Sequence, residues 1–157
     1  MMASDNLHGV VKSALRFVLI YGIALGLNYV WEMLQMPFYQ QMTFTDLGSY
    51  LMCLKASFGD ANIVIAIYGL GLLLFRHWRW PLGMTPWKAT YLIATGGITA
   101  ILIEHSALKG DRWSYSSLMP RLPVLEIGLI PFLQLIILPY LSYAIACRRR
   151  LCRPQPA

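Results

Sequence analysis

Charged residues are scarce in this chain: they make up 13% of its 157 residues, and only seven residues are acidic. A soluble globular domain has about 25% charged and about 45–50% apolar residues. Here 57% of the residues are hydrophobic, which excludes an ordinary soluble domain and indicates a protein that crosses a membrane several times. The segments between apolar runs are too short for a soluble domain, so we expect one integral membrane domain over residues 1–157.

Cysteine and histidine are also rare, with three of each. The cysteines are Cys53, Cys147 and Cys152, which show no CxxC spacing and predict no disulfide framework. The histidines are His8, His77 and His105. Two of these fall on one side of the expected membrane and the third on the other, so no pair can ligate one haem iron. Nucleotide-loop, zincin and GxSxG motifs are absent, and the cofactor, if there is one, is left open.

Four apolar segments are suited in length to the hydrocarbon core of a bilayer, which is about 30 Å thick. We expect transmembrane helices over residues 14–36, 58–76, 87–105 and 124–146. A short interfacial helix over residues 45–56, capped by Thr45 or Asp46, should precede the second span. Trp78 and Trp80 follow that span and are expected at the membrane interface. The predicted fold class is therefore all-α, a bundle of four transmembrane helices.

Basic residues are distributed unequally around these spans. With the amino terminus inside, the cytoplasmic side holds most of them: Lys12, Arg16, Arg76, Arg79, Lys88, Arg148, Arg149, Arg150 and Arg153. The other side holds Lys55, Lys109, Arg112 and Arg121. The positive-inside rule therefore predicts both termini in the cytoplasm. Because the net charge of +6 is explained by orientation against the cytoplasmic leaflet, we expect no binding to nucleic acid.

Each expected span carries one carboxylate near the same, outer end. Glu32 and Glu104 end the outward-going helices, whereas Asp60 and Glu126 begin the inward-going ones. Further polar or aromatic residues lie near that level or in the loop above it: Asn28, Gln35, His105, Arg112, Trp113, Tyr115, Arg121 and Gln134. Polar groups in a membrane helix usually face the bundle interior or a water-filled cavity. The sequence thus predicts a polar chamber at one end of the bundle.

Carboxylates in such a chamber suit two kinds of chemistry. An acid among apolar side chains keeps its proton readily and can act as a general acid, with a second carboxylate or His105 as the base. Carboxylates with one histidine are also ligands for divalent metals, so whether a metal is bound stays open.

Three blocks of the sequence resemble a family of small, uncharacterised bacterial inner-membrane proteins. They are NYVWEMLQMPFY (28–39), CLKASFGDANIVIA (53–66) and EHSALKGDRWSYSSLMPRLPVLEIGLIPFLQ (104–134). The resemblance implies a multi-pass protein of the bacterial inner (plasma) membrane and no particular activity.

Residues 104–134 also resemble the helical lycopene cyclase domains of carotenoid biosynthesis. Those domains have an acid, then a G-x-W-x-Y element, then a helix with proline and paired acids. Glu104, residues 110–115 and Pro131 follow this order, with one extra residue between glycine and tryptophan. Leu133 and Gln134 stand where the paired acids are expected. The resemblance implies acid–base chemistry on an isoprenoid lipid.

Two hypotheses for function follow. In the first, the chain is a membrane-embedded enzyme acting on an apolar, isoprenoid-like lipid, with Glu104 as the acid, His105 or Glu32 as the base, and Trp113 and Tyr115 at the mouth. In the second, it is a non-enzymatic accessory protein that binds a membrane protein partner or a lipid. Its acids would then be members of structural ion pairs with nearby lysines and arginines.

Overall fold

The computed structural model describes the backbone of residues 2–148, and the side chains of residue 11 and residues 14–147. This part of the chain forms four α-helices and a short 3-10 turn: α1 (Met2–Gln35), η1 (Met36–Phe38), α2 (Leu47–Phe75), α3 (Pro86–Lys109) and α4 (Leu129–Arg148). The prediction of an all-α fold with four helices is confirmed, and all four are long and apolar enough to cross a membrane. Some residues named in the sequence predictions have side chains outside this described part of the chain: His8, Lys12, Arg148, Arg149, Arg150, Cys152 and Arg153.

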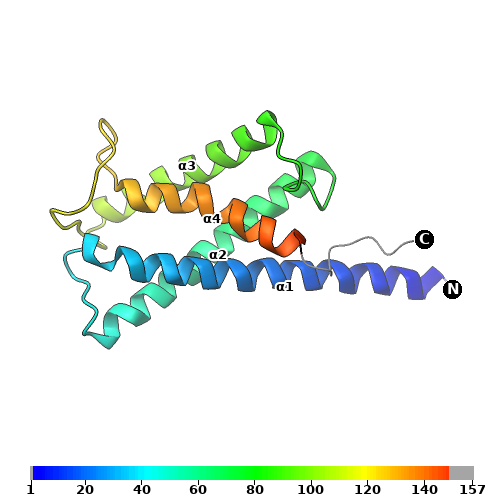
Figure 1. Ribbon diagram of the computed structural model, residues 1–157, viewed down its shortest axis with the longest axis horizontal. Coiled ribbons are helices and arrows are strands. Elements are labelled where there is room, and N and C mark those ends of the chain that lie inside the picture. The colour runs from blue at the N-terminus through cyan, green and yellow to red at the C-terminus, as the bar shows by residue number, and fades with distance from the viewer. Residues whose placement is uncertain (1, 149–157) are drawn as a thin grey trace.

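The ends of the four helices fall into two groups on opposite sides of the molecule (Figure 1). The amino-terminal end of α1 and the carboxyl-terminal end of α4 point to the same side, as Figure 1 shows. Helices α2 and α3 form a V, close together at the loop that joins them and far apart at their other ends (Figure 1). The end of α1, the start of α2, the end of α3 and the start of α4 therefore lie on the same side of the molecule, and we call this side the chamber end.

Aromatic side chains form the core on the opposite side, where α2 and α3 approach each other. Trp80 is only 1% exposed, and its Nε1 donates a hydrogen bond to the carbonyl of Tyr68 at 3.3 Å. The hydroxyl of Tyr143 donates to the carbonyl of Val64 at 2.6 Å. Gly71 makes room for the indole, because a Cβ there would lie 2.3 Å from Trp80 Cζ2. Trp80, which the sequence predicts at the membrane interface, thus packs into the core of the bundle.

Helix α2 is one continuous helix where the sequence predicts an interfacial helix and a separate span. The predicted cap is confirmed for Asp46, whose side chain accepts from the backbone N–H of Ser49 at 3.0 Å. The predicted division into helices over 45–56 and 58–76 is wrong, since α2 is continuous over Leu47–Phe75. Gly59 does not interrupt it, because one glycine costs a helix only about 1 kcal/mol and burial on either side outweighs this cost. Asp60 therefore lies in the middle of α2 and not at a helix amino terminus.

Helix α4 begins at Leu129, later than the predicted start at residue 124. Val124 and Glu126 have φ angles of 72° and 54°, a left-handed conformation that no α-helix contains. Pro120 and Pro123 precede them and favour the loop. Glu126 is consequently an exposed loop residue, and the prediction that it begins the fourth span is wrong.

The other two helices are longer than predicted. Helix α1 begins at Met2 rather than at residue 14, and α3 continues to Lys109 rather than ending at residue 105. Neither extension contains a proline, so nothing in them breaks a helix.

The loops after α1 and α3 pair with each other over the chamber end. Tyr39 and Tyr115 form an isolated antiparallel bridge. The N–H of Gln40 donates to the carbonyl of Ser114 at 3.1 Å, and the N–H of Ser116 donates to the carbonyl of Phe38 at 2.9 Å. This pairing fixes the position of the aromatic residues of the α3–α4 loop above the helices.

Candidate functional site

A buried hydrogen-bond network joins three helices at the chamber end. Gln134 on α4 donates from Nε2 to Glu32 Oε1 on α1 at 3.0 Å and to Asp60 Oδ2 on α2 at 2.8 Å. The same nitrogen lies 3.0 Å from Asn28 Oδ1. An amide nitrogen has only two hydrogens, so these three acceptors share them. The carboxyls of Glu32 and Asp60 are thereby held close to the neutral amide of Gln134.

This network also sets the orientation of Gln35. Because Gln134 uses Nε2 on its acceptors, its Oε1 is the acceptor for Gln35 Nε2, at 3.2 Å. The other end of the Gln35 amide, Oε1, is buried and has no hydrogen-bond partner in the described part of the chain. A buried acceptor without a partner is costly, so a hydrogen-bond donor placed beside Gln35 Oε1 would be stabilised.

The third carboxyl, Glu104 on α3, is held by the α3–α4 loop. It is only 4% exposed, and its Oε2 accepts from the hydroxyl of Tyr115 and from Trp113 Nε1 at 3.4 Å. The same tyrosine hydroxyl accepts from the backbone N–H of Gly128 at 2.9 Å, so its own proton must point to Glu104. Both donors act on Oε2, which leaves Oε1 for other contacts.

The two tyrosines of the loops remain protonated well above neutral pH. Burial raises the pKa of the Tyr115 hydroxyl above its ordinary value, and the hydrogen bond to Glu104 raises it further. Burial likewise raises the pKa of Tyr39, and the nearby carboxyls of Glu104 and Glu32 add to the effect. Both hydroxyls therefore stay protonated at neutral pH, and that of Tyr115 donates to Glu104.

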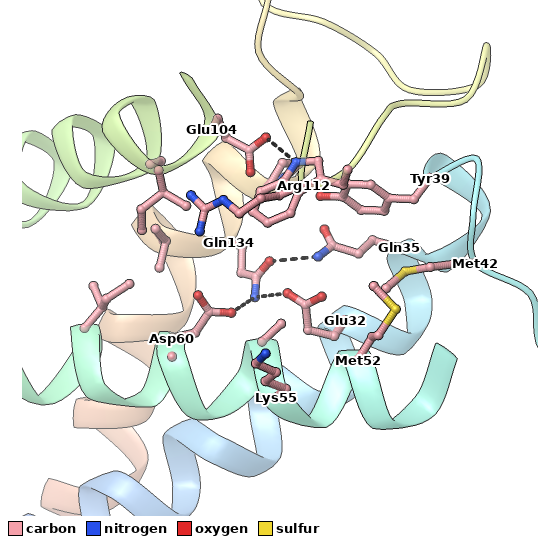
Figure 2. A pocket seen from close by; sticks show the side chains of 18 of the residues that line it. Glu32, Gln35, Tyr39, Met42, Met52, Lys55, Asp60, Glu104, Arg112 and Gln134 are labelled. Carbon is pink, nitrogen blue, oxygen red and sulfur yellow. Dashed lines mark hydrogen bonds between the residues drawn. The ribbon is translucent and has the colours of Figure 1, made fainter. Parts of the chain in front are cut away.

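A cavity of about 600 Å³ lies among these groups, and we call it the chamber. Its polar wall includes the three carboxyls, Gln35 and Gln134, which Figure 2 shows facing one another across the space. The rest of the wall is largely apolar and includes Met42, Met52, Ile63, Ile103 and Leu135. A volume of this size is typical of pockets for small ligands, which combine apolar walls with a few polar groups.

Two cations reach the chamber from different elements. Lys55 projects from α2 and Arg112 from the α3–α4 loop, and Figure 2 shows them on opposite sides of Gln134. Arg112 Nη2 donates to Ser106 Oγ at 3.2 Å. Within the described residues, Glu32, Asp60 and Glu104 form no ion pair with either cation, although Arg112 lies near enough to influence Glu104 electrostatically.

Most of the residues predicted for a site do come together. The chamber is lined by Glu32, Gln35, Asp60, Glu104, Arg112, Trp113 and Gln134. Asn28 lies within hydrogen-bond distance of the lining residue Gln134, and Tyr115 donates a hydrogen bond to Glu104.

Three predicted residues lie elsewhere. His105 does not line the chamber, because adjacent residues of a helix are about 100° apart and Glu104 already faces inward. Arg121 is exposed, with its guanidinium 5.5 Å from the centroid of the Tyr115 ring. Glu126 is also exposed and outside the lining. His105 therefore has no position from which to act as the base for Glu104.

The site also includes four residues that the sequence pattern does not predict as parts of it: Lys55, Tyr39, Met42 and Met52. The sequence places Lys55 on a short interfacial helix, whereas in the structure it lies on the continuous α2 and lines the chamber. Tyr39 is placed by the pairing of two loops, which no local pattern predicts. Its ring packs edge-on against Trp113, with centroids 6.4 Å apart.

A metal site would need several histidine, cysteine or acidic side chains close together. In the described part of the chain, no group of three or more histidine, cysteine or acidic side chains is placed to hold a metal ion. The carboxyls that do converge are occupied with amide, hydroxyl and indole donors.

No protein-family model matches this chain, and comparison with curated proteins and with solved structures finds no similar protein.

Proposed function

We propose that this chain is an integral membrane enzyme that holds an apolar lipid in the chamber and transfers protons to and from it. One observation carries the proposal. Three carboxyls from three helices face an apolar cavity of about 600 Å³ and are held by neutral donors rather than by cations. Carboxyls arranged in this way are available for proton transfer, since they are not neutralised by fixed ion pairs.

Glu104 is the proposed general acid. Tyr115 and Trp113 both donate to its Oε2, so the proton of the acid form is carried by Oε1. Glu104 Oε1 gives this proton to an atom of the lipid, and the Glu32–Asp60 pair removes a proton elsewhere on the same molecule. Gln134 acts as a positioning residue, because it orients both carboxyls of that pair.

Positive charge that develops on the lipid during proton transfer has suitable partners in the chamber. Carboxylates stabilise it electrostatically, and Tyr39 and Trp113 add aromatic side chains to the chamber lining. The apolar walls suit the isoprenoid-like chain expected from the sequence, and they also suit an acyl chain.

Membrane insertion and orientation are part of the proposal. The four apolar helices are long enough to cross a bilayer. With both termini on the cytoplasmic side, most basic residues are also on that side. The chamber would then open toward the outer side of a bacterial inner membrane.

The experiment is a search for catalysed hydrogen exchange. The full chain is reconstituted with a bacterial lipid extract in D₂O, and mass spectrometry follows deuterium at carbon in each lipid species. The wild type is expected to label one lipid class, because reversible protonation at carbon exchanges hydrogen with solvent. Glu104→Gln should abolish the labelling, whereas Glu126→Gln, the same change at an exposed position, should retain it. Equal labelling by wild type and Glu104→Gln would rule out the role of Glu104.

The accessory-protein hypothesis also has one observation in its favour. The Gln134 network joins α1, α2 and α4, so it stabilises the bundle whether or not chemistry occurs. On that hypothesis the protein binds a lipid or a membrane protein partner, and no lipid gains deuterium beyond the protein-free control. The same labelling experiment therefore distinguishes the two functions.

A further inference from the structure

Among the described side chains, four cations lie at the end of the bundle opposite the chamber: Arg16, Arg76, Arg79 and Lys88. The acidic side chains that the structure describes line the chamber or lie near it, at the chamber end: Glu32, Asp46, Asp60, Glu104, Asp111 and Glu126. None of these acids is therefore in a position to neutralise the four cations. A cluster of one charge sign without fixed partners produces a positive potential that attracts anions.

Arg16 on α1 packs against the loop between α2 and α3. Its guanidinium carbon, Cζ, lies 3.8 Å from the centroid of the Trp78 ring, so the guanidinium rests on the face of the indole. Nε of Arg16 is buried and has no hydrogen-bond partner in the described part of the chain. Nη1 and Nη2 make no hydrogen bond to a described residue either, but they are not buried. The outer edge of the guanidinium is therefore open to a ligand.

The indole on which Arg16 rests is fixed by the core of the bundle. The hydroxyl of Tyr68 on α2 donates to the backbone carbonyl of Trp78 at 2.7 Å. Trp80, two residues farther along the loop, is 1% exposed and belongs to the aromatic core. The stacked guanidinium is thus already ordered before a ligand arrives, which reduces the entropic cost of binding.

A second guanidinium lies at the same indole. Arg79 Cζ is 5.3 Å from the centroid of the Trp78 ring, and the residue is half-buried. Arg16 and Arg79 are therefore like charges held close together, without an acidic partner among the described residues. Their mutual repulsion costs free energy, and an anion bound beside them relieves it.

The position of this site along the helices indicates which anion is present there. Arg16 is the third residue of the apolar stretch Ala14–Phe38, and Trp78 follows the end of α2 at Phe75. The ends of apolar spans lie at the boundary between hydrocarbon and water, where the lipid headgroups are. Arginine binds phosphate through two parallel N–H donors, and a guanidinium stacked on a ring keeps its outer N–H groups free for this.

We infer that Arg16, stacked on Trp78, binds the phosphate of an anionic phospholipid in the leaflet opposite the chamber, and that Arg79 strengthens the attraction. The inference uses the membrane insertion proposed above but not the chemistry of the chamber, which lies at the other end of the helices. Only the head of the lipid is recognised. Its tails stay among the other lipids of the leaflet and need no groove in the protein.

The test compares two phospholipids with the same acyl chains. Phosphatidylglycerol is anionic, whereas the phosphate of phosphatidylcholine is neutralised by its own choline. Each is titrated into the purified full chain in a neutral detergent, and native mass spectrometry measures the bound lipid. The wild type should bind phosphatidylglycerol at least about tenfold more tightly, because one charge-assisted hydrogen bond is worth about that factor. Equal affinity for the two lipids would overturn the inference.

Three variants separate this site from a general effect of charge. Arg16→Gln should remove most of the preference for phosphatidylglycerol. Trp78→Leu should weaken binding of this lipid by about threefold or more at unchanged net charge, because the guanidinium loses the ring that orients it. Arg76→Gln is the matched control, since Arg76 is an exposed arginine of the same loop with no ring contact among the described residues. It should bind both lipids nearly as the wild type does.

The variant series rejects the site in two cases. One is an unchanged preference in Arg16→Gln, and the other is an equal loss in Arg76→Gln, which would show that only total charge matters. Arg16→Lys keeps the charge without the planar fork, so its affinity for phosphatidylglycerol should lie between those of the wild type and Arg16→Gln. Wild-type affinity in Arg16→Lys would also contradict the stacked arrangement, and this variant serves if Arg16→Gln fails to fold.

A soluble phosphate compound is the alternative ligand for the same arginine. Inorganic phosphate is therefore added in excess to the lipid complex, with sodium chloride at equal ionic strength as the control for screening. The lipid should stay bound, because its tails remain in the micelle and keep the head beside Arg16. Displacement by phosphate but not by chloride would reject the lipid as the ligand. These measurements involve no deuterium labelling, so failure of the chamber chemistry and failure of this inference are separate results.

Discussion

Gln134 on α4 lies 2.8 Å from Asp60 on α2, and the nitrogen that makes this contact also lies 3.0 Å from Glu32 on α1. One neutral amide thereby connects two acids on different helices. The contact links the fold to the proposed chemistry, since the same hydrogen bonds hold the bundle together and orient the carboxyls.

Replacing this amide should destabilise the protein. Gln134→Leu keeps much of the side-chain volume but removes the donor to Glu32, Asp60 and Asn28, leaving buried acceptors unsatisfied. The free energy of unfolding should fall by about 3 kcal/mol, seen as a lower midpoint of thermal unfolding in detergent. Gln41→Leu, an exposed position at the chamber, is the control. A Gln134→Leu midpoint equal to that of the wild type would show that the network adds no stability.

The tyrosines of the loops should make stability depend on alkaline pH. The pKa of Tyr39 and of Tyr115 is raised in the folded protein above its ordinary value of 10.0. Above about pH 10 the unfolded chain loses these protons while the folded chain retains them, so stability falls as pH rises.

The matching variant is Tyr39→Phe with Tyr115→Phe. It should start from a lower stability at neutral pH, because Gly128 and Glu104 lose their partner, but its stability should fall less steeply above pH 10. Thermal unfolding at a series of pH values measures both slopes. Parallel slopes for the two proteins would mean that these hydroxyls ionise equally in the folded and unfolded states.

Close packing of α3 on α4 depends on Gly96. A Cβ at this position would lie 2.2 Å from the backbone oxygen of Leu135, so the two helices would have to move apart. Gly96→Ala should therefore lower the free energy of unfolding by about 1–3 kcal/mol. Gly69→Ala on α2, where nothing lies within 4 Å, should be neutral or slightly stabilising. Equal stability of the two variants would refute this account of the helix contact.

The orientation in the membrane can be read with single cysteines. In a variant without Cys53, Cys147 and Cys152, a membrane-impermeant thiol reagent should label Ser117→Cys in intact spheroplasts. His77→Cys, at an exposed position in the loop between α2 and α3, should be labelled only after the membrane is permeabilised. The reverse pattern would show that the chamber end faces the cytoplasm.

Several features of the site follow from the sequence alone. The apolar runs are long enough for four helices, and the alternating direction of successive spans places Glu32, Asp60 and Glu104 at one end. The spacing of Asn28, Glu32 and Gln35 puts them on one face of a helix. These inferences depend on helix geometry and hydrophobicity, which are local properties.

Other features depend on parts of the chain that are distant in sequence. Whether Glu104 or its neighbour His105 faces inward depends on how α3 is rotated against α4. Glu126 leaves the site because the α3–α4 loop adopts left-handed backbone angles, and Lys55 joins it because α2 runs unbroken through Gly59.

The sequence by itself therefore determined the fold class, the number of helices long enough to cross a membrane and the end at which the acids gather, because hydrophobic length and helical periodicity act within each segment. Only the tertiary structure decided which carboxyls share Gln134, that Tyr115 must donate to Glu104, and that Gln35 keeps an open acceptor. Hydrogen bonds between side chains depend on the rotation and crossing of whole helices, and packing among all four helices sets that geometry.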